Sequence, residues 1–315
     1  MNLKKLKVLF LGLIVLVFGL KAQGATLTIQ VIKSGELKAY EEAYSGFQKV
    51  LKEQLKQVQF KEYILKNNSE ENEKTLTELQ KSSSLILTIG TEATKLVSQR
   101  IKDKPVIFCM VLDPVGSGLV ENLVPSGNNL SGSSLDIPVK EQLEKFRLLV
   151  SGLKNLGVLY TSETERKVKT AEVVAKSLGI NLVSVKVSSE KEIPQSLEWL
   201  KEQTQGLWSV PDGDIFSPSS TEQILLFTLR NGIPFMGLSS VYVRAGALFA
   251  LDCDYADIGR QAGEVALLIL HGNLSSEVPV TTPRKIYLFI NQKTSERIGL
   301  QIPNNLLKIA EEVIR

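Results

Sequence analysis

The chain alternates short apolar runs with longer amphipathic segments. Short runs rich in Val, Ile and Leu indicate strands covered on both faces, and apolar residues at helical spacing indicate helices packed on one side. In the first part of the chain this pattern predicts strands at 26–32, 59–65, 85–89, 106–112 and 130–135. Between them it predicts helices at 37–55, 70–81 and 91–100. Strands that are joined through helices pair in parallel.

A second series of the same alternation begins at Val139. It predicts strands at 156–160, 180–187, 206–210, 233–237 and 247–251, and helices at 139–150, 165–178, 193–202, 220–231 and 255–270. A last strand falls within 278–290, followed by helical pieces at 295–299 and 304–314. Two such series predict an α/β fold with two doubly wound, Rossmann-like lobes that are connected by several short crossovers.

The first 24 residues are typical of a secretory signal peptide. Basic residues precede an apolar run at 8–20, and Ala22-Gln23-Gly24 offers small residues for cleavage. This run is shorter than the roughly 20 residues that a spanning helix needs, although an uncleaved anchor remains open. No cysteine lies near the cleavage site, so we expect no lipoprotein anchor and a mature protein that is free in a periplasm.

Charge narrows the possible partners. Cleavage would remove four lysines and no acidic residue, which changes the formal net charge from +3 to −1. The basic balance of the whole chain is therefore a targeting feature, and we expect no nucleic-acid partner. The remaining residues, about 290, suit two lobes better than one core.

The stretch from Ser82 to Val120 holds the most informative candidate site. Gly90-Thr91 follows the strand at 85–89, and Asp113-Pro114 follows the strand at 106–112. In an open parallel sheet ligands bind at the carboxyl ends of the strands, and the start of a helix attracts anions. We expect Thr91 to cap the helix that follows. A turn and a cap without a ligand is the simpler alternative.

Several short segments, taken in order, resemble one protein family. They are Gly90-Thr91-Glu92-Ala93, Asp113-Pro114-Val115-Gly116 with Gly118-Leu119-Val120, Asn129-Leu130-Ser131-Gly132, Val210-Pro211-Asp212, Ile233-Pro234-Phe235 and Ile298 to Pro303. Their order and spacing resemble the periplasmic solute-binding proteins of ABC transporters with a type I periplasmic-binding-protein fold. The branch in question includes aromatic amino-acid binders.

The resemblance implies an architecture and partners. It implies a ligand cleft between a first lobe of 25–133 plus 255–288 and a second lobe of 134–254 plus 289–315. It also implies a monomer that captures a small molecule, such as an amino acid or a related anion, by lobe closure and delivers it to an ABC transporter permease at the membrane. Two alternatives remain open: a ligand-binding accessory protein of a periplasmic sensor, and a periplasmic hydrolase.

The candidate ligand site combines strand ends of both lobes. We expect Thr91 to offer its hydroxyl and nearby backbone N–H groups to an anionic group, and Asp113 to accept from an ammonium or to brace its own turn. Asp212 follows a strand of the second lobe and is expected to reach the ligand after closure. The full predicted set is Ser34, Gly90, Thr91, Asp113, Tyr160, Asp212, Ser239 and Tyr242.

The sequence gives little support for a catalytic site or a metal site. The only histidine, His271, precedes Gly272 at a predicted helix end, so any histidine-based catalytic site would need this one residue. The acidic residues Asp252, Asp254 and Asp257 are expected to serve as caps and hinge residues, with Asp254 capping the helix that begins at Tyr255. We expect neither a metal ion nor a cofactor.

Cysteines and large aromatic residues lie within or next to strand-like runs. Cys109 and Cys253 are expected to be two buried, small hydrophobic side chains, although a disulfide remains open. Trp208, Phe108 and Phe235 are expected to pack in the core. Tyr242 is the aromatic residue that we expect to face the cleft.

Overall fold

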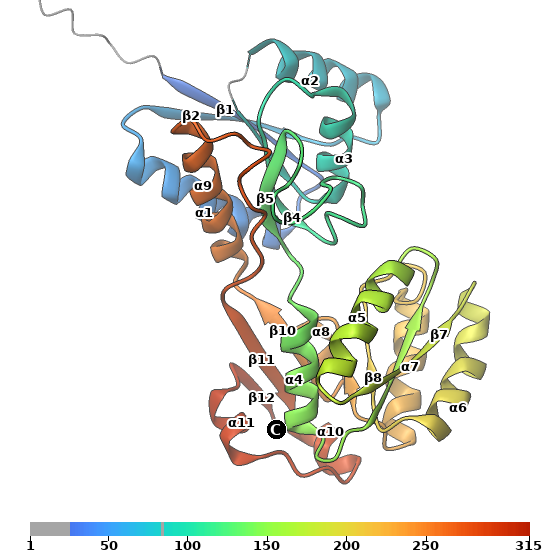
Figure 1. Cartoon of the computed structure of the whole chain (residues 1–315). Helices are drawn as coiled ribbons and strands as arrows, with labels where there is room; N and C mark the ends of the chain where they lie inside the picture. The colour runs from blue at the N-terminus through green and yellow to red at the C-terminus, as the bar shows by residue number, and fades with distance from the viewer. Residues whose placement is uncertain (1–25, 83–84) are drawn as a thin grey trace, which may run out of the picture.

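The computed structural model describes residues 26–82 and 85–315, so the predicted signal peptide lies outside the described residues. These residues form two lobes, each a sheet covered by helices, with the chain crossing between them (Figure 1). The α/β architecture predicted from the alternation of strands and helices is confirmed.

The first lobe carries a five-stranded sheet in which all the paired strands are parallel. Its elements are β1 (Leu27–Lys33), α1 (Lys38–Gln54), β2 (Val58–Ile64), α2 (Ser69–Ser82), β3 (Ile86–Ile89), α3 (Thr91–Arg100), β4 (Val106–Val111), β5 (Leu130–Ser134) and α9 (Tyr255–Leu270). The strand order is β2-β1-β3-β4-β5. In β4, Ile107 and Cys109 pack with α1 and α9, whereas Val106 and Phe108 pack with α2 and α3. Helices on both faces explain why this strand is apolar throughout.

The second lobe carries a seven-stranded sheet with the order β12-β11-β10-β9-β8-β6-β7. Only β10 and β11 pair antiparallel within it. Its core is split between the two sheet faces, with α4, α5 and α11 on one face and α6 and α7 on the other. The elements are α4 (Val139–Leu149), β6 (Asn155–Tyr160), α5 (Glu165–Ser177), β7 (Asn181–Lys186), η1 (Glu190–Glu192), α6 (Ile193–Gln203), β8 (Leu207–Trp208), α7 (Pro218–Arg230), β9 (Phe235–Met236), α8 (Ser240–Ala245), β10 (Phe249–Cys253), β11 (Ile286–Asn291), α10 (Gln292–Arg297), α11 (Asn304–Ile309) and β12 (Glu312–Ile314).

The end of the chain differs from the prediction. We expected a helix at 304–314, but α11 stops at Ile309 and the chain then forms β12. The strand pairs in parallel with β11, so that Phe289 lies opposite Glu312. Pairing at the open edge of the sheet thus outweighs the local helical pattern. The short helix α8 was also missed, because its six residues carry too little periodic signal.

The chain crosses between the lobes three times, at 135–138, at Asp254 and at 283–285. We expected the third crossing after residue 288, but β11 already joins the second sheet at Ile286. The second and third crossings run side by side, because Cys253 pairs with Ile286 and the Asp254 N–H donates to the Lys285 carbonyl at 3.3 Å.

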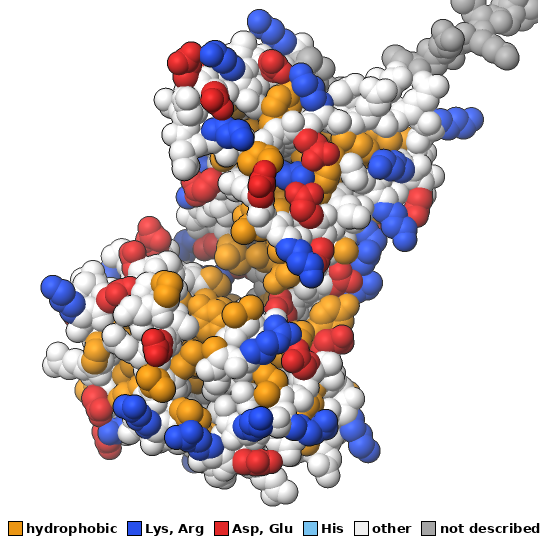
Figure 2. Space-filling view, turned by 180° about the vertical axis from the view of Figure 1, so that it is seen from behind, with side chains coloured by type: hydrophobic (Ala, Val, Ile, Leu, Met, Phe, Trp, Pro, Cys, Tyr) orange, Lys and Arg blue, Asp and Glu red, His pale blue; other side chains and the backbone are white. Residues whose placement is uncertain are grey.

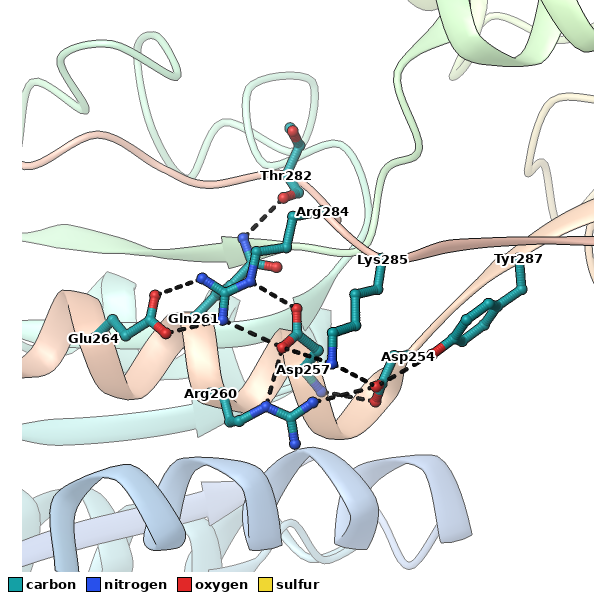
Figure 3. Close-up of polar contacts among 9 residues, drawn as sticks. All are labelled: Asp254, Asp257, Arg260, Gln261, Glu264, Thr282, Arg284, Lys285 and Tyr287. Carbon is teal, nitrogen blue, oxygen red and sulfur yellow. Dashed lines mark hydrogen bonds and ion pairs between the residues drawn. The ribbon is translucent and has the colours of Figure 1, made fainter. Parts of the chain in front are cut away.

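A network of ion pairs, the hinge network, joins these two crossings on the α9 side (Figure 3). The side chain of Asp257 is only 3% exposed, and its carboxylate accepts from Arg260 Nε at 3.0 Å and from Arg284 Nε at 2.8 Å. Burial raises the pKa of Asp257, but the hydrogen bonds from Arg284 and Arg260 outweigh burial and hold this pKa below its usual value. Arg284 also pairs with Glu264 at 2.8 Å.

Asp254 links the hinge network to the second lobe. As predicted it caps α9, since its side chain accepts from the Asp257 N–H at 2.9 Å. Its other carboxylate oxygen accepts from Arg260 at 3.2 Å and from the hydroxyl of Tyr287, on β11, at 3.4 Å.

Within residues 26–82 and 85–315, no helix is long and apolar enough to cross a membrane.

Candidate ligand-binding cleft

Two cavities lie between the lobes and meet at shared residues. The inner cavity, about 210 Å³, lies against the crossings and is lined partly by Leu135, Ile137 and Tyr255. The outer cavity, about 530 Å³, lies toward the α3 side of the first lobe. Both are lined by Leu112, Lys167 and Pro211. Seen from behind, hydrophobic side chains border an opening between the lobes (Figure 2).

The ends of β3 and β4 meet at one edge of the first sheet. Thr91 and Asp113 follow these strands and both line the outer cavity. The structure thus brings together the two residues that the sequence singled out as a pair, as expected for neighbouring parallel strands.

The start of α3 is built differently from the prediction. Thr91 is the first helical residue, and the N-cap is Gly90, with φ 92° and no side chain. Ser34, in the loop after β1, supplies the missing acceptor, because its Oγ accepts from the Ala93 N–H at 2.9 Å. A side chain at position 90 would meet Ser34 Oγ and the Tyr40 hydroxyl, each at 2.6 Å from its Cβ. Ser34 and Gly90 therefore shape the helix start behind Thr91.

Asp113 is engaged within the protein. Its φ of 43° is left-handed, a conformation that Asp tolerates better than most residues. Its Oδ1 accepts from the Gly116 N–H at 2.9 Å and from Arg166, in the second lobe, at 2.7 Å. The bracing role that the sequence left open is therefore present, and it leaves less of this carboxylate for a ligand.

Lys167 lines both cavities, and its partner Asp136 lines the inner one. Asp136 follows β5, and its Oδ1 accepts from Lys167 Nζ. Its Oδ2 accepts from the Ser134 hydroxyl at 2.9 Å and from the Asp113 N–H. The side chains of Lys167 and Asp136 are only 16% and 20% exposed, so this ion pair is largely withdrawn from water.

A second carboxylate, that of Asp252, lines the inner cavity. Its Oδ1 accepts from the Tyr255 hydroxyl at 2.9 Å, and its Oδ2 accepts from the Ser240 N–H at 3.2 Å. Burial and the charge of Asp252 both raise the pKa of Tyr255 above its usual value, so the phenol stays a donor. Asp252 makes no ion pair with a lysine or arginine of the described residues. Asp252, which also accepts from the Cys253 N–H at 2.9 Å, therefore brings to the inner cavity a carboxylate without an ion pair among the described residues.

The remaining predicted site residues lie in different places. Ser239 lines the inner cavity. Tyr160 ends β6 and packs against the core of the second lobe. Tyr242 packs edge to face on Phe216, with ring centroids 6.0 Å apart, and does not line either cavity.

Asp212 lies beneath the cleft surface, with a side chain that is buried. Its Oδ2 accepts from the Thr161 hydroxyl at 2.8 Å and the Thr164 hydroxyl at 2.6 Å, and also from the Thr161 N–H. We therefore assign this carboxylate to bracing the loop after β6 rather than to reaching the ligand.

Residues predicted to pack in the core do so. Trp208, Phe108 and Phe235 are all buried. Cys109 and Cys253 are free and buried, and burial raises the pKa of each thiol to about 12. His271 is the C-cap of α9, as the sequence indicated.

Sequence reasoning missed Lys167, Asp136 and Asp252 as site residues. Asp136 follows a strand end of the first sheet, just as Asp113 does, and this signal was available. Arg166 and Lys167 stand in the first turn of α5, where the helix dipole disfavours cations. Two cations in that place were a second signal that something outside the helix holds them.

The comparisons with known proteins agree on one family. Residues 28–314 match the profile described as ABC transporter substrate binding protein. A tyrosine-binding protein of Clostridioides difficile is 31% identical over 220 residues, which cover 69% of this chain and 63% of that protein, less than two thirds of its length. An uncharacterized protein of Rickettsia prowazekii is 23% identical over 227 residues, covering 70% of this chain and 69% of that protein.

Solved structures share the fold. The ligand-free, open structure of a substrate binding protein with adhesive properties from Clostridium difficile has a TM-score of 0.76 and 23% identity, and covers 92% of this chain and 99% of that one. An ABC domain in complex with L-Trp from Streptococcus pneumonia has a TM-score of 0.69 and 24% identity, and covers 92% and 100%. Because the family profile spans nearly all of the described residues, the chain belongs to the ABC transporter substrate-binding protein family.

Proposed function

We propose that this protein captures a small solute between its two lobes by closure of the cleft and delivers it to the membrane permease of an ABC transporter. Membership of the family supports this role. The observation that carries it is the convergence of both lobes on two joined cavities, with Lys167 of the second lobe at the junction. A cleft between lobes joined by narrow crossings is suited to closing around a ligand.

The cleft favours a zwitterion with an apolar body. Lys167 donates to Asp136, and an ammonium has three donors, so further donors remain for a ligand carboxylate. Asp252, unpaired among the described residues, would accept from the ammonium of the ligand. Apolar side chains line the inner cavity, including Leu112, Met236 and Leu251. An amino acid with a large side chain meets these demands, and the tyrosine-binding relative and the L-Trp complex support an aromatic one.

Calorimetric titration of the mature protein tests this proposal. We expect L-tyrosine, L-tryptophan or another apolar amino acid to bind with a Kd below about 100 μM, which corresponds to about 5.5 kcal/mol. Each charge-assisted bond is worth roughly 1.5–3 kcal/mol, so analogues without the amino group or without the carboxylate should bind at least about tenfold more weakly. The proposal fails if no amino acid binds, or if both truncated analogues bind as tightly as the parent.

We infer that the protein is a binder and not a catalyst. His271 ends α9, and the sixteen residues of that helix place it roughly 24 Å from the crossing where the helix begins. The Cys253 thiol lines the inner cavity, but burial raises its pKa to about 12, so it is not a nucleophile at neutral pH. Mass spectrometry should recover the bound solute unchanged, and a chemically altered solute would contradict this inference.

We further propose that the protein works as a monomer outside the cytoplasm, as a carrier that must present both lobes to a permease. Sedimentation of the mature protein should give a mass near that of one chain at micromolar concentration. A stable dimer would require a different account of how the cleft reaches the permease.

A further inference from the structure

Two consecutive basic side chains, those of Arg166 and Lys167, extend from the same point of the second lobe. Arg166 and Lys167 occupy the first turn of α5, where the helix dipole opposes positive charge. The helix provides its own anion in Glu165, but that carboxylate is shared by Lys169 at 2.6 Å and Lys186 at 2.7 Å, which lower its pKa to about 2. Arg166 is instead held by Asp113 of the first lobe, and Lys167 by Asp136 in the crossing at 135–138.

Arg166 reaches the first lobe directly. Its Nη2 donates to Asp113 Oδ1 at 2.7 Å, and the two side chains are 54% and 29% exposed. Asp113 adopts a left-handed backbone conformation, which orients its carboxylate toward Gly116 and Arg166. Backbone strain of this kind concentrates at functional sites.

Gly116 leaves the space in which the pair forms. A Cβ at this position would lie 2.1 Å from Asp113 Oδ2 and 2.8 Å from Arg166 Nη2. Gly116 does not have a positive φ, so the backbone itself would accept an alanine. The three atoms nearest to a side chain at position 116 thus all belong to the ion pair.

The ion pairs of Arg166 and Lys167 are connected through Asp113. The Asp113 N–H donates to Asp136 Oδ2, and Asp136 Oδ1 accepts from Lys167. Asp113 therefore contacts Arg166 through its carboxylate and Asp136 through its backbone N–H.

We propose that Asp113 and Arg166 form a latch across the cleft that stabilises the closed lobes and thereby sets the affinity for every ligand by the same factor. This inference rests on the proposed function, in which closure traps a solute. Asp113 and Arg166 are positioning residues here, because the Asp113 Oδ1 bonds are made within the protein, whereas Lys167 and Asp252 determine which ligand binds.

The test is calorimetry and stopped-flow binding with Arg166→Gln, Gly116→Ala and the double variant. Exposed ion pairs are worth up to about 1 kcal/mol, so each single change should weaken all amino-acid ligands by about two- to fivefold, through faster dissociation. The double variant should be no weaker than either single one, since both changes remove the same pair. The matched control is Lys61→Gln, which breaks an exposed pair with Glu78 at 2.8 Å inside the first lobe and should change nothing.

A second measurement needs no ligand. Spin labels on Glu71→Cys and Lys191→Cys, both exposed and in different lobes, report the distance between the lobes. The native thiols are buried and should not react with the label. We expect Arg166→Gln to broaden this distance distribution toward longer values, and Lys61→Gln to leave it unchanged.

An Arg166→Gln protein with unchanged lobe distances, or with losses of affinity that differ from ligand to ligand, would overturn the latch. A wild-type protein that binds no amino acid would instead contradict the proposed function, and the spin-label distances would still decide whether the latch exists.

Discussion

The contact between α1 and α9 allows a sharp prediction about Gly259. Through α9 the chain comes back from the second lobe and packs against α1 in the first lobe. Gly259 of α9 lies directly against the α1 backbone. A Cβ at position 259 would lie 1.7 Å from the carbonyl oxygen of Ala43, about half of a normal van der Waals separation. A carbonyl within a helix cannot rotate away, so Gly259→Ala must push the two helices apart.

The size of the effect follows from two opposing contributions. Alanine stabilises a helix interior by about 1 kcal/mol relative to glycine. Overpacking a tight core costs about 1–3 kcal/mol and more where the backbone has to move. Because the obstacle at Gly259 is backbone, overpacking wins, and we expect a net loss of about 1–3 kcal/mol. At Gly263 the nearest atom is Val50 Cβ at 2.9 Å, and the nearest backbone atom, the Phe47 carbonyl oxygen, is 3.3 Å away, so Gly263→Ala should cost less than Gly259→Ala.

Urea unfolding followed by circular dichroism measures this difference. Gly259→Ala should unfold at a clearly lower urea midpoint than the wild type, with the midpoint of Gly263→Ala between the two. In thermal unfolding the loss should lower Tm by about 2–4 °C per kcal/mol. If Gly259→Ala is as stable as the wild type, the close helix crossing and the reasoning from it are wrong.

Three further predictions concern other parts of the chain. Asp257→Asn should destabilise the protein by about 1–3 kcal/mol at pH 7, because the variant leaves Arg260 and Arg284 without their shared buried carboxylate. Since the pKa of Asp257 is lowered in the folded protein, its contribution is fully present above about pH 4 and is lost as the pH falls through the folded pKa, so the midpoints of wild type and variant should converge in acid. Asp212→Asn should lower the free energy of unfolding by about 1–3 kcal/mol, because its carboxylate holds Thr161 and Thr164, and it should reduce the free energy of ligand binding by less. A stable Asp212→Asn variant with a tenfold loss of affinity would return Asp212 to the ligand site. Both cysteines should resist a thiol reagent at pH 8 and react after unfolding, and fast reaction of the native protein would contradict their burial.

Much of the fold could be predicted from the sequence because parallel strands with two covered faces are apolar throughout. In β4 every residue is buried, and the pattern marks its position to within one residue. The failures come where local pattern and tertiary pairing disagree. Residues 310–314 look helical on their own, but the free edge of β11 offers backbone partners that a helix cannot match.

The site was predicted in part, for a related reason. Thr91 and Asp113 could be placed together because adjacent parallel strands end at the same edge of a sheet. Whether a carboxylate faces a ligand or braces a loop depends on partners that are distant in sequence. Asp212 is held by Thr161 and Thr164, about fifty residues earlier, and Asp113 by Arg166, so no local pattern separates them from Asp252, which stays unpaired among the described residues.

The central claim is that Asp252 receives the ammonium of a zwitterionic solute in the inner cavity. The most direct measurement is a thermodynamic cycle by calorimetry, in which wild type and Asp252→Asn each bind the best amino acid and its analogue without the amino group. We predict that Asp252→Asn weakens the amino acid at least about tenfold, or 1.4 kcal/mol, and leaves the affinity for the analogue nearly unchanged. An equal loss for both ligands, or no loss for the amino acid, would contradict the claim.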